Sequence, residues 1–277
     1  MIELPEANTL AKQIEETLMK KTVKSVLAAS SPHKFAWFLG DPAEYPRRLQ
    51  GNNILTAEAA GGMVEIKLNH AHLLFCDGVN LRYHQPGDPI PSKHQLLLSF
   101  TDGSALSASV QMYGGLYCWV DGDPFDNAYY LAAKEKPSPL NDEAFDEAYF
   151  LQILTNEKTM NLNLKAALTT QQRIPGLGNG VLQDILWQAK LSPHCKVNTL
   201  SAEETYTLFL SLKQTLAEMT RLGGRDTEKD LFGRPGGYKV IMSSKKQGSP
   251  CPDCGAPIVK EAYLGGSVYY CRECQRS

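Results

Sequence analysis

Residues 251–274 read CPDCGAPIVKEAYLGGSVYYCREC, a stretch with two Cys-x2-Cys pairs separated by sixteen residues. Four thiolates in two such pairs are typical of a tetrahedral zinc site without an open position, where the metal holds shape and does not catalyse. Gly255 follows the first pair, where a tight turn favours a residue that tolerates a positive φ. The sequence therefore predicts one structural Zn²⁺ ion. Its ligands are Cys251, Cys254, Cys271 and Cys274.

The composition around this tail is that of an ordinary globular protein. The chain has 277 residues, 43% of them hydrophobic and 21% charged, which favours two domains. No apolar run is long enough to span a bilayer, and the N-terminus lacks the pattern of a signal peptide. We therefore expect a cytoplasmic monomer, nucleoid-associated if bacterial, with no membrane partner. Disulfides, the alternative for the four cysteines, are disfavoured in that compartment. Three further cysteines are expected in the core: Cys76, Cys118 and Cys195.

The net charge of −2 conceals an asymmetry between the two halves of the chain. Residues 1–150 carry 12 Lys/Arg and 19 Asp/Glu, whereas residues 151–277 carry 16 and 11. The basic half attracts phosphate mildly, which is compatible with a nucleic-acid partner. An ordinary solvated surface of mixed charge explains the same numbers equally well.

Periodicity divides the chain into a strand-rich part and a helical part. Leu10, Ile14 and Leu18 follow helical spacing, and Asn8 is a candidate N-cap. From about 22 to 130 the pattern is one of short strands: MVEIKL at 63–68, two strands around a turn at 101–103, and GGLYCWV as another strand. This favours a β-sandwich or barrel with the first helix laid against it.

An acidic, proline-bearing stretch marks a domain boundary near 130–142. Beyond it the chain is expected to be helical up to about 222, with Ser201 and Glu204 forming a capping box and Gly223-Gly224 ending the last helix. The predicted domains are an N-terminal catalytic-type β-sandwich at 1–135, a helical DNA-binding domain at 143–225 and the zinc finger at 236–277.

The stretch QQRIPGLGNGVLQDILWQ at 171–188 places a glycine turn directly before an apolar helix. Free backbone N–H groups at that helix start, together with the Asn179 side chain, can bind a phosphate, and Lys165 lies on the preceding segment. Considered alone, this motif is explained equally well by a plain turn between two helices.

Taken together and in this order, ELPE at 3–6, a β domain, GLGN at 176–179 and a four-cysteine finger resemble the formamidopyrimidine-DNA glycosylase/endonuclease VIII family. The resemblance covers essentially the whole chain. It implies an α+β fold with a helix–two-turn–helix domain and a cleft between the domains. The implied partner is double-stranded DNA containing a damaged base or an abasic site, with the damaged nucleotide flipped toward the N-terminus. The implied residues are catalytic Glu3 and Glu6 and DNA-binding Lys165, Gly178 and Asn179.

The chain departs from this family at several functional positions. The family nucleophile is the α-amine of a proline exposed by removal of Met1, and Ile2 stands there instead; its amine can form an imine only if Met1 is removed. Gly62 falls at the position of a catalytic lysine, and Gly266 at that of the finger arginine. In the wedge that fills the space left by a flipped base, Gln111 replaces an arginine and Tyr113 a phenylalanine; Tyr113 can still stack and Gln111 can still bond an orphan base.

Hydrolysis of an N-glycosidic bond passes through an oxocarbenium-like state that a carboxylate can assist, whereas strand cleavage by elimination needs the amine. The sequence therefore predicts a base-excision-repair DNA glycosylase that hydrolyses the bond at a damaged base, with weak or no AP-lyase activity. One alternative is a catalytically inactive protein that binds damaged DNA on the same scaffold. Another is an RNA- or protein-binding zinc-finger protein, in which Glu3 and Glu6 are merely helix-start acids favoured by the helix dipole.

Overall fold

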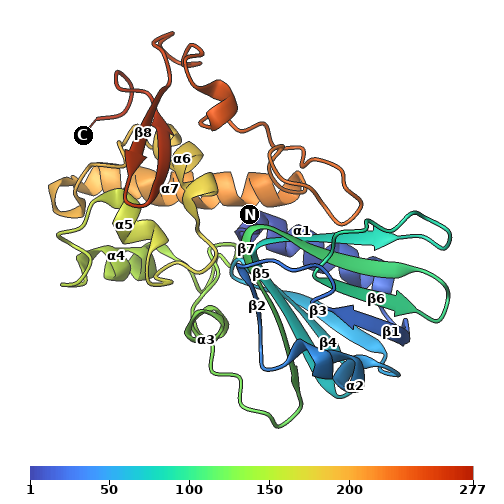
Figure 1. Ribbon diagram of the computed structural model, residues 1–277. Helices are drawn as coiled ribbons and strands as arrows, with labels where there is room; N and C mark the ends of the chain where they lie inside the picture. The colour runs from blue at the N-terminus through green and yellow to red at the C-terminus, as the bar shows by residue number, and fades with distance from the viewer. Residues whose placement is uncertain (277) are drawn as a thin grey trace.

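The computed structural model describes residues 1–276 and confirms the predicted α+β fold class. A sheet domain and a helical region lie side by side, and the C-terminal hairpin stands on the helical region (Figure 1). The N-terminus lies in the middle of the view, where these parts meet. The domain limits at 135, 143, 225 and 236 stay predictions. Within residues 1–276 no helix is both long and apolar enough to cross a membrane.

Seven strands form one connected sheet in the order β1-β6-β7-β5-β4-β3, with β2 parallel to β7. Their bounds are β1 Val23–Ala28, β2 Ala36–Phe38, β3 Ile54–Ala60, β4 Met63–Leu68, β5 Ala71–His84, β6 Leu96–Phe100 and β7 Ala105–Val120. A 3-10 turn (Pro42–Glu44) and the short helix α2 (Tyr45–Leu49) connect β2 to β3. The two long strands β5 and β7 run through both halves of the sheet, so residues from both halves share one hydrophobic core.

The strand predicted after the turn at 101–103 and the further strand predicted in GGLYCWV are not separate, because β7 runs continuously through both. Its pairing with β5 shifts register between Asp77, which pairs with Gly114, and Val79, which pairs with Val110. At Gly78 a Cβ atom would lie 2.6 Å from the Tyr113 carbonyl oxygen, so glycine lets the two backbones approach this closely at the register shift.

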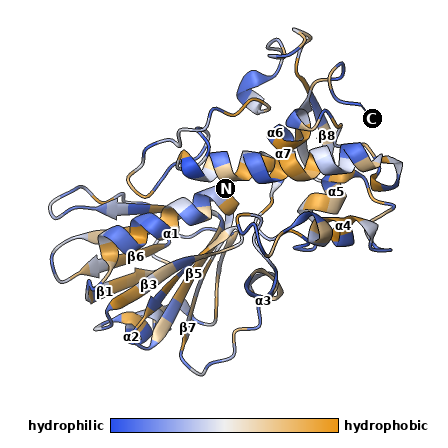
Figure 2. Ribbon diagram, turned by 180° about the vertical axis from the view of Figure 1, so that it is seen from behind, coloured by the Kyte–Doolittle hydropathy of each residue, from blue (hydrophilic) through white to orange (hydrophobic). Residues whose placement is uncertain are grey.

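The first helix, α1 (Leu4–Leu18), packs on β3 and β4 with the predicted residues Leu10, Ile14 and Leu18 buried. Its N-cap is Glu3, so the expectation that Asn8 caps the helix is wrong. Pro5, whose φ suits the first helical turn, lets the helix begin earlier. Figure 2 shows α1 with one hydrophilic and one hydrophobic side.

The helical region contains α3 (Ala128–Glu135), α4 (Glu147–Thr155), α5 (Leu164–Thr169), α6 (Asn179–Gln188) and α7 (Ala202–Arg221). The predicted capping box at Ser201 and Glu204 is present, and α7 ends just before Gly223 and Gly224, both at positive φ. The α6 side chains predicted to be apolar and inward-facing are buried: Val181, Leu182, Ile185 and Leu186.

The C-terminal hairpin of β8 (Val259–Tyr263) and β9 (Gly266–Tyr270) is fixed on α6. The buried Asp184 carboxylate accepts the backbone N–H groups of Ile241 (3.0 Å) and Met242 (2.7 Å) in the segment leading to the finger. Burial raises the pKa of Asp184 to about 6, although these hydrogen bonds oppose the shift. The finger is thereby joined to the helix that begins at the glycine turn.

Candidate active site

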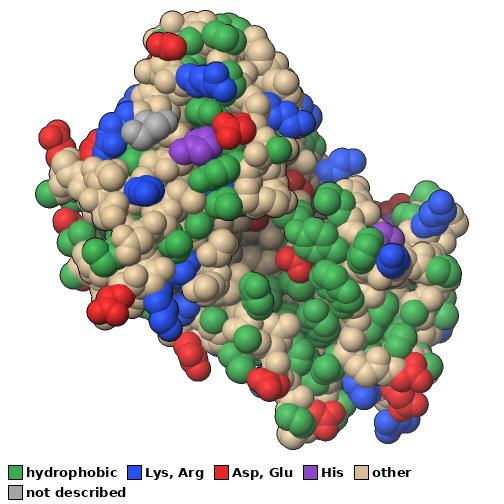
Figure 3. Space-filling model, turned by 60° about the vertical axis from the view of Figure 1, so that its left-hand side comes forward, with side chains coloured by type: hydrophobic (Ala, Val, Ile, Leu, Met, Phe, Trp, Pro, Cys, Tyr) green, Lys and Arg blue, Asp and Glu red, His purple; other side chains and the backbone are tan. Residues whose placement is uncertain are grey.

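A cavity of about 530 Å³ lies between the sheet domain and the helical region. Its lining includes the first three residues of the chain, Cys76 and Asp77 of β5, and the turn at 176–178 before α6. Figure 3 shows a hollow between these two parts of the molecule, with hydrophobic side chains on one wall. The elements predicted to carry chemistry therefore meet at one place.

Glu3 lies at this cavity and is held by the start of α6. Its carboxylate accepts the backbone N–H groups of Gly180 (2.9 Å) and Val181 (2.8 Å), and the side chain is buried. A Cβ atom at Gly178 would lie 2.5 Å from the Glu3 carboxylate, so glycine is required for this approach. Two of the amides expected to be free for phosphate at this helix start, those of Gly180 and Val181, are thus occupied, because the positive end of the helix dipole holds Glu3.

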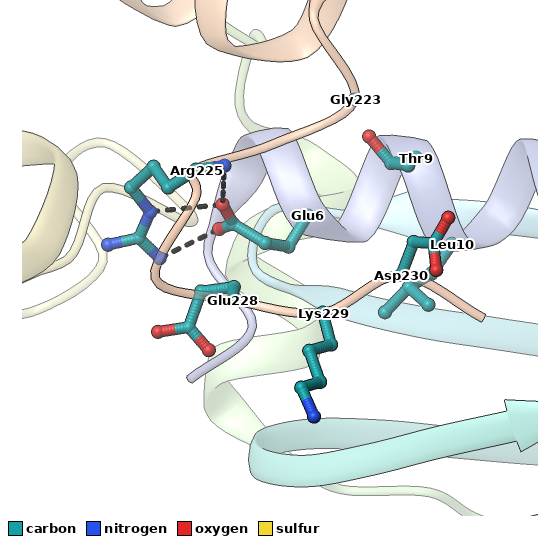
Figure 4. Close-up of a pocket in the computed structure, with 8 residues that line it drawn as sticks. All are labelled: Glu6, Thr9, Leu10, Gly223, Arg225, Glu228, Lys229 and Asp230. Atoms are coloured by element: carbon teal, nitrogen blue, oxygen red, sulfur yellow. Dashed lines mark hydrogen bonds and ion pairs between the residues drawn. The ribbon is translucent and has the colours of Figure 1, made fainter. Parts of the chain in front are cut away.

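Arg225 lies between Glu3 and the second N-terminal carboxylate, Glu6. Figure 4 shows its contacts with Glu6. Its guanidinium donates to Glu6 through Nε (3.0 Å) and Nη2 (2.8 Å), its backbone N–H also donates to Glu6 (3.0 Å), and Nη1 lies 3.5 Å from Glu3. All three side chains are buried. Glu6 does not line the large cavity, so we interpret it as a residue that positions Arg225 and the N-terminus. No local sequence pattern singled out Arg225.

Burial raises the pKa of Glu3, and the repulsion of Glu6 adds to this shift. The charge of Arg225 and the two amide donors lower the pKa but offset the rise only in part. A carboxylate whose pKa is raised at a cavity accepts a proton more readily than an ordinary glutamate, which suits it to act as a general base.

The N-terminal backbone is fixed at the cavity edge. The Met1 amine pairs with Glu228 (2.6 Å), and the Ile2 N–H donates to the Asp77 carbonyl (2.7 Å). With Met1 in place the Ile2 nitrogen is an amide without nucleophilic character. A Cβ atom at Gly62 would lie 3.2 Å from the Ile2 carbonyl oxygen, so the turn between β3 and β4 packs directly on this backbone.

Lys165, Asn179 and Gly266, far apart in sequence, lie together beside the finger. The Asn179 amide donates to the Ser267 carbonyl (2.8 Å), and the Lys165 ammonium donates to the Tyr263 carbonyl. A Cβ atom at Gly266 would lie 3.5 Å from the Lys165 nitrogen and 4.0 Å from the Asn179 amide nitrogen. Burial lowers the pKa of Lys165. Among residues 1–276, the buried Asn179 Oδ1 has no hydrogen-bond partner.

The two residues predicted for the wedge lie in β7 where its pairing with β5 shifts from Val110 to Gly114. Gln111 is exposed, while Tyr113 lines the cavity and packs on Trp37 with ring centroids 5.8 Å apart. Between them Met112 is 67% exposed, which sequence reasoning missed because an isolated methionine in a strand carries no pattern of its own. Asp77 and Trp37 at the cavity were missed for the same reason.

The four tail cysteines come together as the spacing predicts. Their sulfur atoms all lie within 4.8 Å of one another, with Cys251–Cys274 at 3.8 Å and Cys254–Cys271 at 3.5 Å. The edge of a tetrahedral zinc–thiolate site is roughly 3.8 Å, so the set fits such a metal. Burial raises the pKa of Cys251, but the Trp187 indole N–H and two backbone amides outweigh burial and lower it to about 6. Burial and the neighbouring thiols raise the pKa of Cys271 and that of Cys274, so the fit to a metal rests on the sulfur geometry.

The fold and site define a class of protein in which a buried carboxylate, Glu3, lies at a cavity between a sheet domain and a helical domain, and a four-cysteine finger follows. Residues 1–123 match the family model described as the formamidopyrimidine-DNA glycosylase N-terminal domain, and residues 136–230 match the H2TH domain of the same glycosylase. The chain belongs to the formamidopyrimidine-DNA glycosylase family.

Relatives with this description resemble the chain over its full length. The formamidopyrimidine-DNA glycosylase of Lactobacillus delbrueckii subsp. bulgaricus is 27% identical over 100% of both chains, and that of Enterococcus faecalis 28% over 100% of this chain and 98% of its own. The crystal structure of the MutM (Fpg) protein from Thermus thermophilus matches with a TM-score of 0.81, at 25% identity over 99% of this chain and 98% of the other. The Lactococcus lactis Fpg in complex with DNA containing an abasic site shares the fold with a TM-score of 0.82, at 24% identity over 99% and 100% of the two chains.

Proposed function

We propose that this protein removes a damaged base from duplex DNA by hydrolysis and has weak or no AP-lyase activity. The observation that carries this proposal is the Glu3 carboxylate, buried at the inter-domain cavity between two amide donors and Arg225. Family membership supports the reaction class, and the DNA complexes of the Lactococcus lactis relative support duplex DNA with a damaged or abasic site as the partner.

In this mechanism the damaged nucleotide leaves the base stack and enters the cavity. The bond between C1′ and the base breaks through an oxocarbenium-like state, whose positive charge the Glu3 carboxylate stabilises. The base departs with the bonding electron pair. A water molecule then adds to C1′ and gives a proton to Glu3, whose raised pKa suits it to receive one, and this proton can pass on to the departed base. Lys165, Gly178 and Asn179 are the proposed DNA-backbone contacts, and Gln111 and Tyr113 the proposed wedge.

Strand cleavage by elimination is disfavoured in this proposal because it requires a Schiff base. The Ile2 nitrogen is an amide while Met1 is present, and its hydrogen is engaged by the Asp77 carbonyl. Only removal of Met1 would create an amine there. The four-cysteine cluster is proposed to bind one structural Zn²⁺, which would keep the finger folded against α6 and take no part in the reaction.

Incubation with duplexes that each contain one lesion, followed by gel analysis with and without hot alkali, tests the proposal. Strand breaks that require alkali would reveal base removal without lyase action. Glu3→Gln is the matched variant, because it keeps the shape of the side chain and removes its charge. Efficient alkali-independent cleavage would contradict the hydrolytic mechanism.

A second candidate is a protein that binds damaged DNA without excising a base. Two features favour it. Gly62 stands where the family has a catalytic lysine, and it packs on Ile2 and Glu3. Gly266 stands where the family has the finger arginine, beside Lys165 and Asn179. Tight binding to abasic-site DNA with no excision from any lesion would select this candidate over the enzyme.

A further inference from the structure

The side chains around the inter-domain cavity combine aromatic rings with negative charge. Trp37, Tyr113, Tyr117 and Tyr129 supply rings, and Asp77 and Glu3 supply carboxyl groups. Among the residues that the structure describes, no Lys, Arg or His side chain lines the cavity. The Met1 amine at its edge is paired with Glu228. A protein that binds a polyanion thus has an acidic pocket where the damaged base would enter.

Asp77 is the acidic group of this wall that lacks a positively charged partner. Its carboxylate accepts the Cys76 thiol (S···O 3.2 Å), and in the described part of the chain it forms no ion pair. Burial and the Asp77 charge raise the pKa of Cys76, so the thiol stays neutral. Asp77 has a φ of 59°, a conformation that Asp and Asn adopt more readily than most residues. Its carbonyl accepts the Ile2 N–H, so the residue is fixed at the cavity.

The field of Asp77 reaches the tyrosine rings. Burial raises the pKa of Tyr117 to about 12, and the nearby Cys76 and Asp77 contribute to this shift. Burial also raises the pKa of Tyr113, with Asp77 and Glu3 contributing. A negative potential over aromatic faces attracts cations, because the face of a π system is itself negative.

We propose that this cavity selects a damaged base that carries a formal positive charge, as a purine alkylated on a ring nitrogen does, and that Asp77 is the specificity-determining residue. This inference rests on the proposed function, since it assumes that the damaged base enters the cavity. The positive ring would lie among the aromatic side chains, with the Asp77 carboxylate as its counter-charge.

A positively charged base is a good leaving group, which agrees with a site that has Glu3 but a glycine, Gly62, where the family has a lysine. When its bond to C1′ breaks, the bonding electron pair goes to the base and neutralises its positive charge. A water oxygen then bonds to C1′, and the water proton goes to Glu3. The base leaves neutral without prior protonation, so neither an amine at position 2 nor a lysine at position 62 is needed.

Binding to three duplexes of the same sequence tests this inference. The first contains N7-methylguanine on a 2′-fluoroarabino sugar, which resists cleavage; the second contains the neutral isostere 7-deaza-7-methylguanine on the same sugar; the third contains a tetrahydrofuran abasic analogue. We expect the charged base to be bound about tenfold more tightly than its neutral isostere, which a cation–π contact with a partly desolvated counter-charge can supply. Asparagine suits the same backbone conformation, so Asp77→Asn is the test variant. Its ratio of affinities for the charged and the neutral base should fall to about one.

Asp123→Asn is the matched control, because it removes one charge from an exposed turn that does not line the cavity. It should keep the roughly tenfold preference for the charged base over the neutral one. Unchanged binding of Asp77→Asn to the abasic analogue would show that the variant is folded. Equal binding of the charged and neutral bases by the unaltered protein would overturn the inference, and a preserved ratio in Asp77→Asn would overturn the role of that residue. The proposed function would survive either result if the abasic analogue were still preferred over undamaged duplex; loss of that preference would refute both.

Discussion

Replacing Arg225 by methionine should destabilise the protein more than any exposed charge change. Arg225 is 3% exposed and makes three hydrogen bonds to Glu6, lies 3.5 Å from Glu3, and donates to the Met1 carbonyl (3.2 Å). Methionine keeps much of the side-chain volume but leaves two buried carboxyl groups without their counter-charge. Breaking a buried ion pair in this way costs about 3–5 kcal/mol.

For a chain of 277 residues this loss corresponds to a fall in the thermal midpoint of about 5–9 °C. The loss should depend on pH with a defined sign. Arg225 lowers the pKa of Glu3, so its removal raises that pKa further above the value in the unfolded chain. The charged carboxylate then destabilises the folded state at high pH. As the pH falls, the folded state takes up the proton first, so the difference between variant and unaltered protein should shrink.

Thermal unfolding followed by circular dichroism at pH 8.0 and pH 5.5 measures both effects. Arg221→Met is the matched control, because Arg221 lies nearby in the chain, forms an equally close pair with Glu218, and is exposed. Its midpoint should change little, since exposed pairs contribute little. Midpoints of Arg225→Met and Arg221→Met that fall equally, or a loss for Arg225→Met that grows as the pH falls, would refute the assignment of Arg225 as the buried counter-charge.

Four further outcomes are expected. Glu3→Gln should lower excision by about 10²–10⁴ and leave DNA affinity nearly unchanged, as measured by single-turnover assays and fluorescence anisotropy; a large loss of affinity would contradict a transition-state role. Asn179→Ala should weaken binding to abasic-site duplex by about 1–3 kcal/mol, equally for different sequences, and unchanged binding would remove Asn179 from the DNA contact. Metal analysis after dialysis without chelator should give about one zinc per chain, with thiol reactivity of the tail rising when a chelator is added; a folded, metal-free tail would disprove the zinc site. Borohydride should trap little covalent complex on abasic DNA from protein whose intact mass includes Met1, and efficient trapping would restore an amine nucleophile.

The sequence by itself determined features that depend on neighbouring residues. The cysteine spacing identified the cluster whose sulfur atoms lie within 4.8 Å, and the 3.6-residue period identified the buried face of α1. The capping box of α7 was readable because its two residues are three positions apart. Such patterns depend on residues a few positions apart, so they can be recognised without knowledge of the tertiary packing.

The tertiary structure decided the environment of each site residue. Arg225 meets Glu6 across 219 positions and the Gly180 amide meets Glu3 across 177, and no local pattern records either contact. Tertiary packing also places the Gly180 and Val181 amides on Glu3 and directs Glu6 toward Arg225 instead of the cavity. It places Asp77 among aromatic rings, with no Lys, Arg or His of residues 1–276 lining the same cavity. The charge balance of a buried site depends on which distant segments fill the space around it, and only the folded chain determines that.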